Sequence, residues 1–168
     1  MKFLWQKIRV LEKRNIIVFV VFFSFLLSIA YSWVYQIEPS VDARAYDTIA
    51  LNLLAGNGFK EHVNLSYKFD PGMLRAGPGY EFFLAGIYAI FGHHYEAVWV
   101  LQALLHALTA WLAYKCARLI FSEHSETIGL IAAGFIGFHP DLIEISAMLM
   151  TETLYLFFTV LTVFVFLK

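Results

Sequence analysis

Residues 16–35 read IIVFVVFFSFLLSIAYSWVY and contain no charged side chain. Twenty apolar residues form a helix about 30 Å long, which matches the thickness of the hydrocarbon core of a bilayer. This run is longer than the roughly 7–15 apolar residues of a signal peptide, and no small-residue cleavage motif follows it. We therefore expect a retained transmembrane helix near the start of the chain.

The composition of the whole chain indicates a membrane protein with several spans. Of its 168 residues, 60% are hydrophobic and 15% are charged, and the mean hydropathy is +0.67. Soluble domains are about 45–50% apolar and about 25% charged. A net charge of −1 provides no basic surface for nucleic acid, so nucleic acid is not an expected partner. The single cysteine, Cys116, excludes an internal disulfide and a cysteine-only metal site.

Three further apolar stretches are long enough to span a bilayer, and they cover residues 97–121, 127–145 and 149–167. In the second of these, Pro140 is expected to bend the far end of the helix. The stretch Phe82–Phe91 has only ten residues, or about 15 Å of helix, so it is interpreted as a helix in the membrane interface. The sequence thus predicts an all-α integral membrane protein with about four transmembrane helices.

The distribution of positive charge predicts the orientation of these helices. Five Lys or Arg residues precede the first span, against the single acidic residue Glu12, so the N-terminus is expected in the cytoplasm. With four spans, Lys115 and Arg118 also lie on the cytoplasmic side, whereas a fifth span at Phe82–Phe91 would place them outside. The four-span interpretation is therefore favoured. It makes residues 1–168 a single membrane domain with a long external loop over residues 36–96.

The external loop is expected to contain a second interfacial helix. Ser40 is suited to cap a helix start, and Asp42 suits the positive end of the helix dipole. From Val41 an apolar residue recurs every fourth position through Leu53, which predicts an amphipathic helix with this stripe facing the membrane. The glycines at Gly56 and Gly58 are expected to end it.

Several motifs of this loop and the later spans resemble one family when they are taken in order. They are DARAYDTIALNLLAGNGF at residues 42–59, RAGPGY at 75–80, Gln102, His139–Pro140 and TETL at 151–154. Together they resemble the GT-C superfamily of membrane glycosyltransferases, in the branch of the protein O-mannosyltransferases and lipid A aminoarabinose transferases. The likeness runs over residues 15–168.

The resemblance implies transfer of a sugar from a polyprenyl-phosphate donor to an acceptor hydroxyl on the non-cytoplasmic membrane face. The expected partners are this donor, membrane lipids and an acceptor that is a lipid, a glycan or a protein; a bacterial-type plasma (inner) membrane is the expected location. Relatives have more spans, so the chain is interpreted as the N-terminal part of a larger fold. The alternative is a non-catalytic membrane subunit, a carrier or a truncated remnant of such an enzyme.

The resemblance assigns catalytic roles to two carboxylates. Asp42 is the candidate general base, since a base must remove the acceptor proton during attack. Glu152 begins an otherwise uncharged span, where an acidic residue is costly and usually functional. Each could instead be a structural carboxylate at a helix N-terminus. Many relatives have a second acidic residue at the position of Ala43, so a tandem-carboxylate mechanism is not expected here.

Cations are needed beside the departing lipid phosphate, and the candidates are Arg44, Arg75 and Lys68. Arg44 could instead form a surface ion pair with Asp47, three residues later.

The remaining polar candidates are expected to support the site, and they are Tyr46, Asp47, Gln102 and His106. Gln102 and His106 share one face of a span, where hydrogen bonds to another helix are the simpler explanation. The adjacent pair His93–His94 has no third ligand at a suitable spacing, so no metal-binding residue is predicted. A requirement for a divalent metal stays open.

Overall fold

The computed structural model describes residues 2–62 and 77–168, with side chains described from residue 15 onward. This part of the chain is helical and contains no strand. Its helices are α1 (Lys2–Tyr35), α2 (Asp42–Leu54), α3 (Pro78–Phe91), α4 (Tyr95–Ile120), α5 (Ser125–Gly137), α6 (Pro140–Ala147) and α7 (Glu152–Leu167). The expected all-α fold is confirmed.

Two helices are long and apolar enough to cross a membrane, namely α4 and the part of α1 from Asn15 to Tyr35. The pair α5 and α6 meets the same criterion only when it is counted as one span bent by 49°. The bend lies just before Pro140, where the sequence predicts it. Helix α7 has 16 residues, or about 24 Å, and starts three residues later than the predicted span. The prediction of four spans therefore stays a prediction.

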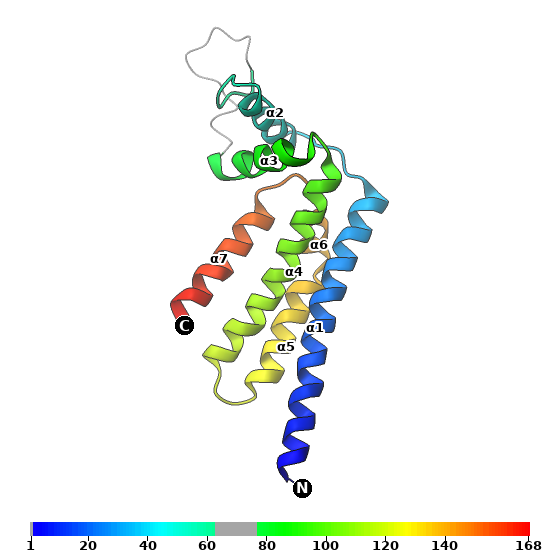
Figure 1. Cartoon of the computed structure of the whole chain (residues 1–168), viewed down its shortest axis with the longest axis vertical. Coiled ribbons are helices and arrows are strands. Elements are labelled where there is room, and N and C mark those ends of the chain that lie inside the picture. Colours follow the sequence, from blue (N-terminus) through cyan, green and yellow to red (C-terminus); the bar gives the residue numbers. More distant parts are fainter. Residues whose placement is uncertain (1, 63–76) are drawn as a thin grey trace.

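The helices form a bundle with a separate layer across one end (Figure 1). Helices α1, α4 and α5 pack side by side, and α7 packs on α4. Helices α2 and α3 pack on each other and lie across the end at which α1 ends and both α4 and α7 begin. The turn between α4 and α5 lies at the opposite end. The described parts of the predicted external loop thus lie together, at one end of the bundle.

Small residues allow the bundle helices to approach closely. Ser24, Ser28 and Ser32 of α1 are fully buried. A Cβ atom added to Gly137 would lie 3.1 Å from the Cβ of Ser24, so α5 meets α1 at a point where only glycine fits easily. Small residues at such contacts are typical of membrane helix packing.

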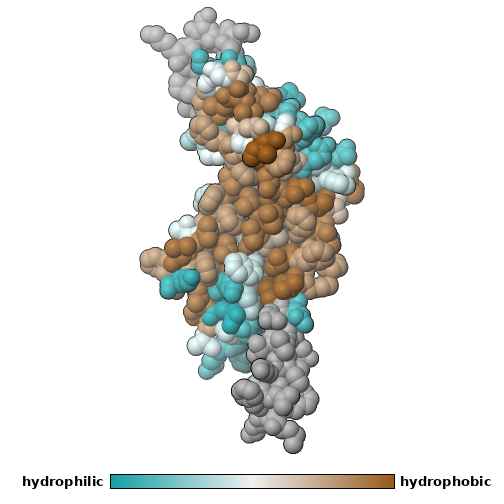
Figure 2. Space-filling view, in the orientation of Figure 1, coloured by the Kyte–Doolittle hydropathy of each residue, from teal (hydrophilic) through white to brown (hydrophobic). Residues whose placement is uncertain are grey.

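The outer surface of the bundle is apolar. Figure 2 shows hydrophobic residues covering its middle, with hydrophilic residues gathered toward the two ends. Many large apolar side chains are exposed there, including Phe19 and Phe22 of α1 and Phe135 of α5. A water-soluble monomer rarely exposes so much contiguous apolar surface. Together with the two long apolar helices, this surface identifies an integral membrane protein.

The start of α2 differs from the sequence prediction. Ser40 makes no capping hydrogen bond; instead Val41 precedes the helix with a φ of 44°, a conformation that β-branched residues rarely adopt. The predicted membrane-facing stripe is also wrong, because Ala45 and Ile49 are fully buried within the protein while Val41 is exposed. Helix α2 therefore buries this face against protein. The periodicity predicted a buried face correctly but assigned it the wrong environment.

Candidate active site

Asp42 is the first residue of α2, and the structure places it beside the connection between α6 and α7. A small cavity of about 160 Å³ is lined on one side by residues 37–43 and on the other by Met148, Leu149 and Met150. Asp42 is half-buried in this wall. Glu152 follows two residues after Met150, at the first position of α7. Two predicted site residues that are far apart in sequence thus lie at the same end of the bundle.

Tyr46, one turn after Asp42, lies within the electrostatic influence of both carboxylates. Burial raises the pKa of the Tyr46 hydroxyl above its ordinary value, and the carboxylates of Asp42 and Glu152 raise it further. Burial also raises the pKa of Tyr80, and Glu152 is the nearby charge that contributes most. The rings of Tyr46 and Tyr80 pack edge to face, with their centres 5.6 Å apart. Both tyrosines therefore lie in the field of Glu152.

Gln102 holds three elements around this group. Its side-chain oxygen accepts a 2.7 Å hydrogen bond from the Tyr80 hydroxyl, and its nitrogen donates to the carbonyls of Ser146 and Met148 at 2.9 and 2.7 Å. Gln102 on α4 thus connects α3 to the end of α6 and the segment before α7. A fully bonded, buried amide of this kind fixes the relative positions of the elements that it joins.

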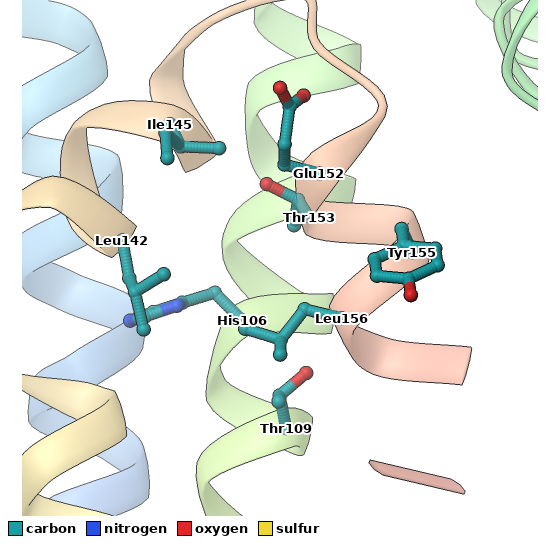
Figure 3. Close-up of a pocket in the computed structure, with 8 residues that line it drawn as sticks. All are labelled: His106, Thr109, Leu142, Ile145, Glu152, Thr153, Tyr155 and Leu156. Carbon is teal, nitrogen blue, oxygen red and sulfur yellow. The ribbon is translucent and has the colours of Figure 1, made fainter. Parts of the chain in front are cut away.

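His106 lies one turn deeper along α4 and faces a second pocket. Its Nε2 lies 3.3 Å from the carbonyl oxygen of Gly137, so part of its role is to join α4 to α5. His106 and Glu152 both line a pocket of about 220 Å³ between α4, α6 and α7 (Figure 3). The structure therefore brings these two predicted residues to one cavity.

Asp47 has a different environment from Asp42. Its carboxylate accepts hydrogen bonds from the hydroxyls of Tyr88 and Tyr95 at 2.7 and 3.1 Å, and His93 Nε2 lies 2.9 Å from it. Burial and the hydrogen bond to Asp47 raise the pKa of Tyr88. These contacts join α2 to the turn between α3 and α4. Asp47 is therefore a structural anchor. Its hydrogen bonds to Tyr88, Tyr95 and His93 take the place of the ion pair with Arg44 that the sequence suggested.

The predicted phosphate-binding cations are only partly described. Arg44 is exposed on α2, two residues after Asp42. Arg75 and Lys68 lie outside the described residues. Among the described residues, no group of three His, Cys, Asp or Glu side chains is placed to hold a metal ion. His93, the first member of the histidine pair, bonds Asp47 instead.

The sequence did not point to Glu81, which is the most unusual acidic residue of the layer. It lies in the first turn of α3, is fully buried, and neither of its carboxylate oxygens has a hydrogen-bond partner among the described residues. Burial raises the pKa of Glu81 above its ordinary value. Glu81 also contributes to the field at Tyr46. The only sequence signal was an acidic residue directly before an apolar run.

Comparison with known proteins identifies a family for the chain. The family model for dolichyl-phosphate-mannose-protein mannosyltransferases matches residues 75–168, which is more than half of the chain. The matched segment includes all of α3 to α7, and with them Tyr80, Gln102 and Glu152. No curated protein and no solved structure matches the chain. The expected resemblance to GT-C membrane glycosyltransferases is therefore confirmed, and the chain belongs to the dolichyl-phosphate-mannose-protein mannosyltransferase family.

Proposed function

We propose that this protein takes part in the transfer of a glycosyl group from a polyprenyl-phosphate donor to an acceptor hydroxyl, at the non-cytoplasmic face of the membrane. The observation that supports this most is the cavity at the end of the apolar bundle, which is lined by Asp42 and by the segment that leads directly to Glu152 at the start of α7. A reaction on a lipid-linked sugar needs its charged groups at this level, since the phosphate of the donor lies at the membrane surface.

In the proposed reaction, Asp42 removes the proton from the acceptor hydroxyl as its oxygen attacks the anomeric carbon of the sugar. The new bond forms between that oxygen and the sugar while the bond from the sugar to the lipid phosphate breaks. The phosphate leaves as an anion, which Arg44 is suited to stabilise because a guanidinium pairs well with phosphate oxygens. Arg75 and Lys68 are proposed for the same role from their positions in the sequence.

The orientation of the site is supported by the charges at the opposite end of the bundle. Lys115 and Arg118 lie in the last two turns of α4, beside the turn to α5. Arg118 forms a 2.8 Å ion pair with Glu126 of α5. The sequence before residue 16 adds five cations to the start of α1. By the positive-inside rule this end is cytoplasmic, and α2 and α3 lie outside, which for a bacterial cell means the periplasmic face of the inner membrane.

A transfer assay with the longest natural form of the protein tests the proposal. Proteoliposomes containing it are supplied with radiolabelled polyprenyl-phosphate sugars and a mixture of lipid, glycan and peptide acceptors. We expect donor-dependent labelling of at least one acceptor class. Labelling from a nucleotide sugar alone would contradict the proposed donor. Absence of labelling from every donor, in protein shown to be folded, would favour the non-catalytic subunit.

A further inference from the structure

The pocket between α4, α6 and α7 has a composition that the proposed donor does not explain. Leu142 and Ile145 of α6 and Leu156 of α7 form apolar walls, and its polar groups are Glu152 and a few uncharged or histidine side chains (Figure 3). None of the described residues that line it is a lysine or an arginine. A pocket for the phosphate end of a donor would need cations. The lining therefore fits a hydrocarbon chain with an uncharged polar group.

One polar group in this pocket lacks a partner. Thr153 is only 6% exposed, and its buried hydroxyl has no hydrogen-bond partner among the described residues. Figure 3 shows this hydroxyl pointing toward α6, beside Ile145. A buried polar group left without a partner costs about 1–3 kcal/mol. Thr109, deeper in the pocket, already donates its hydroxyl hydrogen to the Leu105 carbonyl at 2.7 Å.

Glu152 defines the chemistry at the outer end of the pocket. As a carboxylate it accepts hydrogen bonds and repels anions. One of its oxygens already accepts a bond of 3.3 Å from the exposed Thr151 hydroxyl. A hydroxyl group other than the one that attacks the sugar is a fitting partner for both Glu152 and Thr153, because it donates to the carboxylate and accepts from the threonine. A lipid phosphate in the same place would meet a like charge.

We propose that this pocket binds part of the hydrocarbon chain of a membrane-borne acceptor, whose hydroxyl-bearing head lies beside Glu152 and Thr153. This inference rests on the proposed function, which requires an acceptor. It assigns the chemical class of that acceptor, an amphiphile that reaches the site from within the bilayer. A volume of about 220 Å³ is below the roughly 300–1,000 Å³ of pockets for drug-sized ligands, so only a segment of the chain is held.

Photo-crosslinking measures the binding step without requiring turnover. The longest natural form in lipid vesicles is mixed with a long-chain alcohol that has a diazirine in its tail, and labelled peptides are identified by mass spectrometry. We expect labelling of peptides from α4, α6 and α7. An excess of unlabelled long-chain alcohol should remove it, whereas the same concentration of the matching alkyl phosphate should not. Stronger competition by the phosphate would overturn the inference and assign the pocket to the donor chain.

Two variants and a matched control sharpen this test. Leu156→Trp fills the pocket, and Thr153→Val keeps its volume but removes the hydroxyl; each is expected to reduce labelling at least fivefold. Phe166→Trp, on the same helix and 91% exposed, should have no effect. Unchanged labelling in both pocket variants would reject the proposed site. If the tryptophan of Leu156→Trp disturbs folding, Thr153→Val still tests the site.

The same variants separate this inference from the proposed function in the transfer assay. Leu156→Trp should raise the KM for a long-chain acceptor about tenfold or more, with the donor KM and the KM for a short-chain acceptor unchanged. A rise in donor KM alone would contradict the acceptor assignment. If the alcohol labels the wild-type protein but the protein transfers no sugar, the pocket is supported as a lipid-binding site and the proposed transferase function is contradicted.

Discussion

At the scale of single residues, the two aspartates of α2 have opposite environments. Asp42 lies half-buried in the wall of a cavity near Glu152, whereas Asp47 is surrounded by Tyr88, His93 and Tyr95. They are five positions apart, about 140° around a helix, so one cannot share the face of the other. This spacing makes the proposed catalytic role of Asp42 and the structural role of Asp47 separable by substitution. Sequence spacing predicted the separation, but it did not predict which hydroxyls would surround Asp47.

Replacing Asp47 should loosen the turn between α3 and α4. Asp47→Ala removes an acceptor of three contacts and leaves the buried Tyr88 hydroxyl without its partner, which costs about 1–3 kcal/mol. We expect faster hydrogen–deuterium exchange in residues 92–95. Thr48→Ala is the control, since the Thr48 hydroxyl bonds only the Arg44 carbonyl in its own helix. Equal exchange in both variants would show that Asp47 does not anchor the turn.

Glu81 should lower the stability of the α2–α3 layer as the pH rises. Because burial raises its pKa in the folded state, the folded protein binds the proton more tightly than the unfolded chain. Stability is therefore greatest below the ordinary carboxyl pKa of 4.5 and is lost as the pH rises through the folded-state value.

Glu81→Gln should remove this dependence, since glutamine does not titrate. The variant is expected to gain stability relative to wild type on going from pH 5 to pH 8, as measured by denaturant titration of the protein in detergent. Glu96→Gln, at an exposed position in the first turn of α4, should show no such gain in stability between pH 5 and pH 8. A Glu81→Gln variant with the pH dependence of the wild type would show that this carboxyl is not the cause.

At the scale of helices, hydropathy predicted the long elements and missed the contacts between them. The apolar runs of α1 and α4 exceed the length of a bilayer crossing, so the sequence alone locates them. The shortness of Phe82–Phe91 predicts an interfacial helix, and α3 lies across the end of the bundle. The burial of Ala45 and Ile49 could not be predicted, because an amphipathic stripe looks the same whether protein or lipid covers it.

The contact between α4 and α5 depends on glycine at one position. A Cβ atom at Gly129 would lie 2.7 Å from Cδ2 and 3.0 Å from the carbonyl oxygen of Tyr114. Gly129→Ala is therefore expected to destabilise the pair by about 1–3 kcal/mol, as overpacking typically does. Gly134→Ala, on the same helix with nothing within 4 Å of the new atom, is the matched control. Comparable unfolding of the two variants in a detergent titration would contradict the packing described here.

At the scale of the whole molecule, the chain reversals bring the candidate site together. Asp42 and Glu152 lie at the same end of the molecule because α2, α3 and the start of α7 lie at one end of the bundle. Counting spans and charges predicted that the two residues share a membrane face. The burial of Glu81 and the hydroxyl of Thr153 in its pocket could not be predicted, since both depend on the packing of helices that are distant in sequence.

Labelling of single cysteines tests the orientation of the bundle. In a Cys116→Ala background, Asn57→Cys lies just after α2 and Glu123→Cys lies in the turn between α4 and α5, and both positions are exposed. A membrane-impermeant maleimide should label Asn57→Cys in intact cells and Glu123→Cys only after permeabilisation. The reverse pattern would place α2 and α3 in the cytoplasm.

The catalytic role of Asp42 is the central claim, and the turnover of Asp42→Asn in the longest natural form tests it most directly. Asparagine keeps the size of the side chain but cannot accept the acceptor proton, so turnover should fall about 10²–10⁴-fold while the circular dichroism spectrum is unchanged. Asp141→Asn, at an exposed position in the first turn of α6, should keep wild-type turnover, and Asp47→Asn should be milder than Asp42→Asn. Near-normal turnover of Asp42→Asn beside an inactive Asp47→Asn would contradict the account and move the base to the other face of α2.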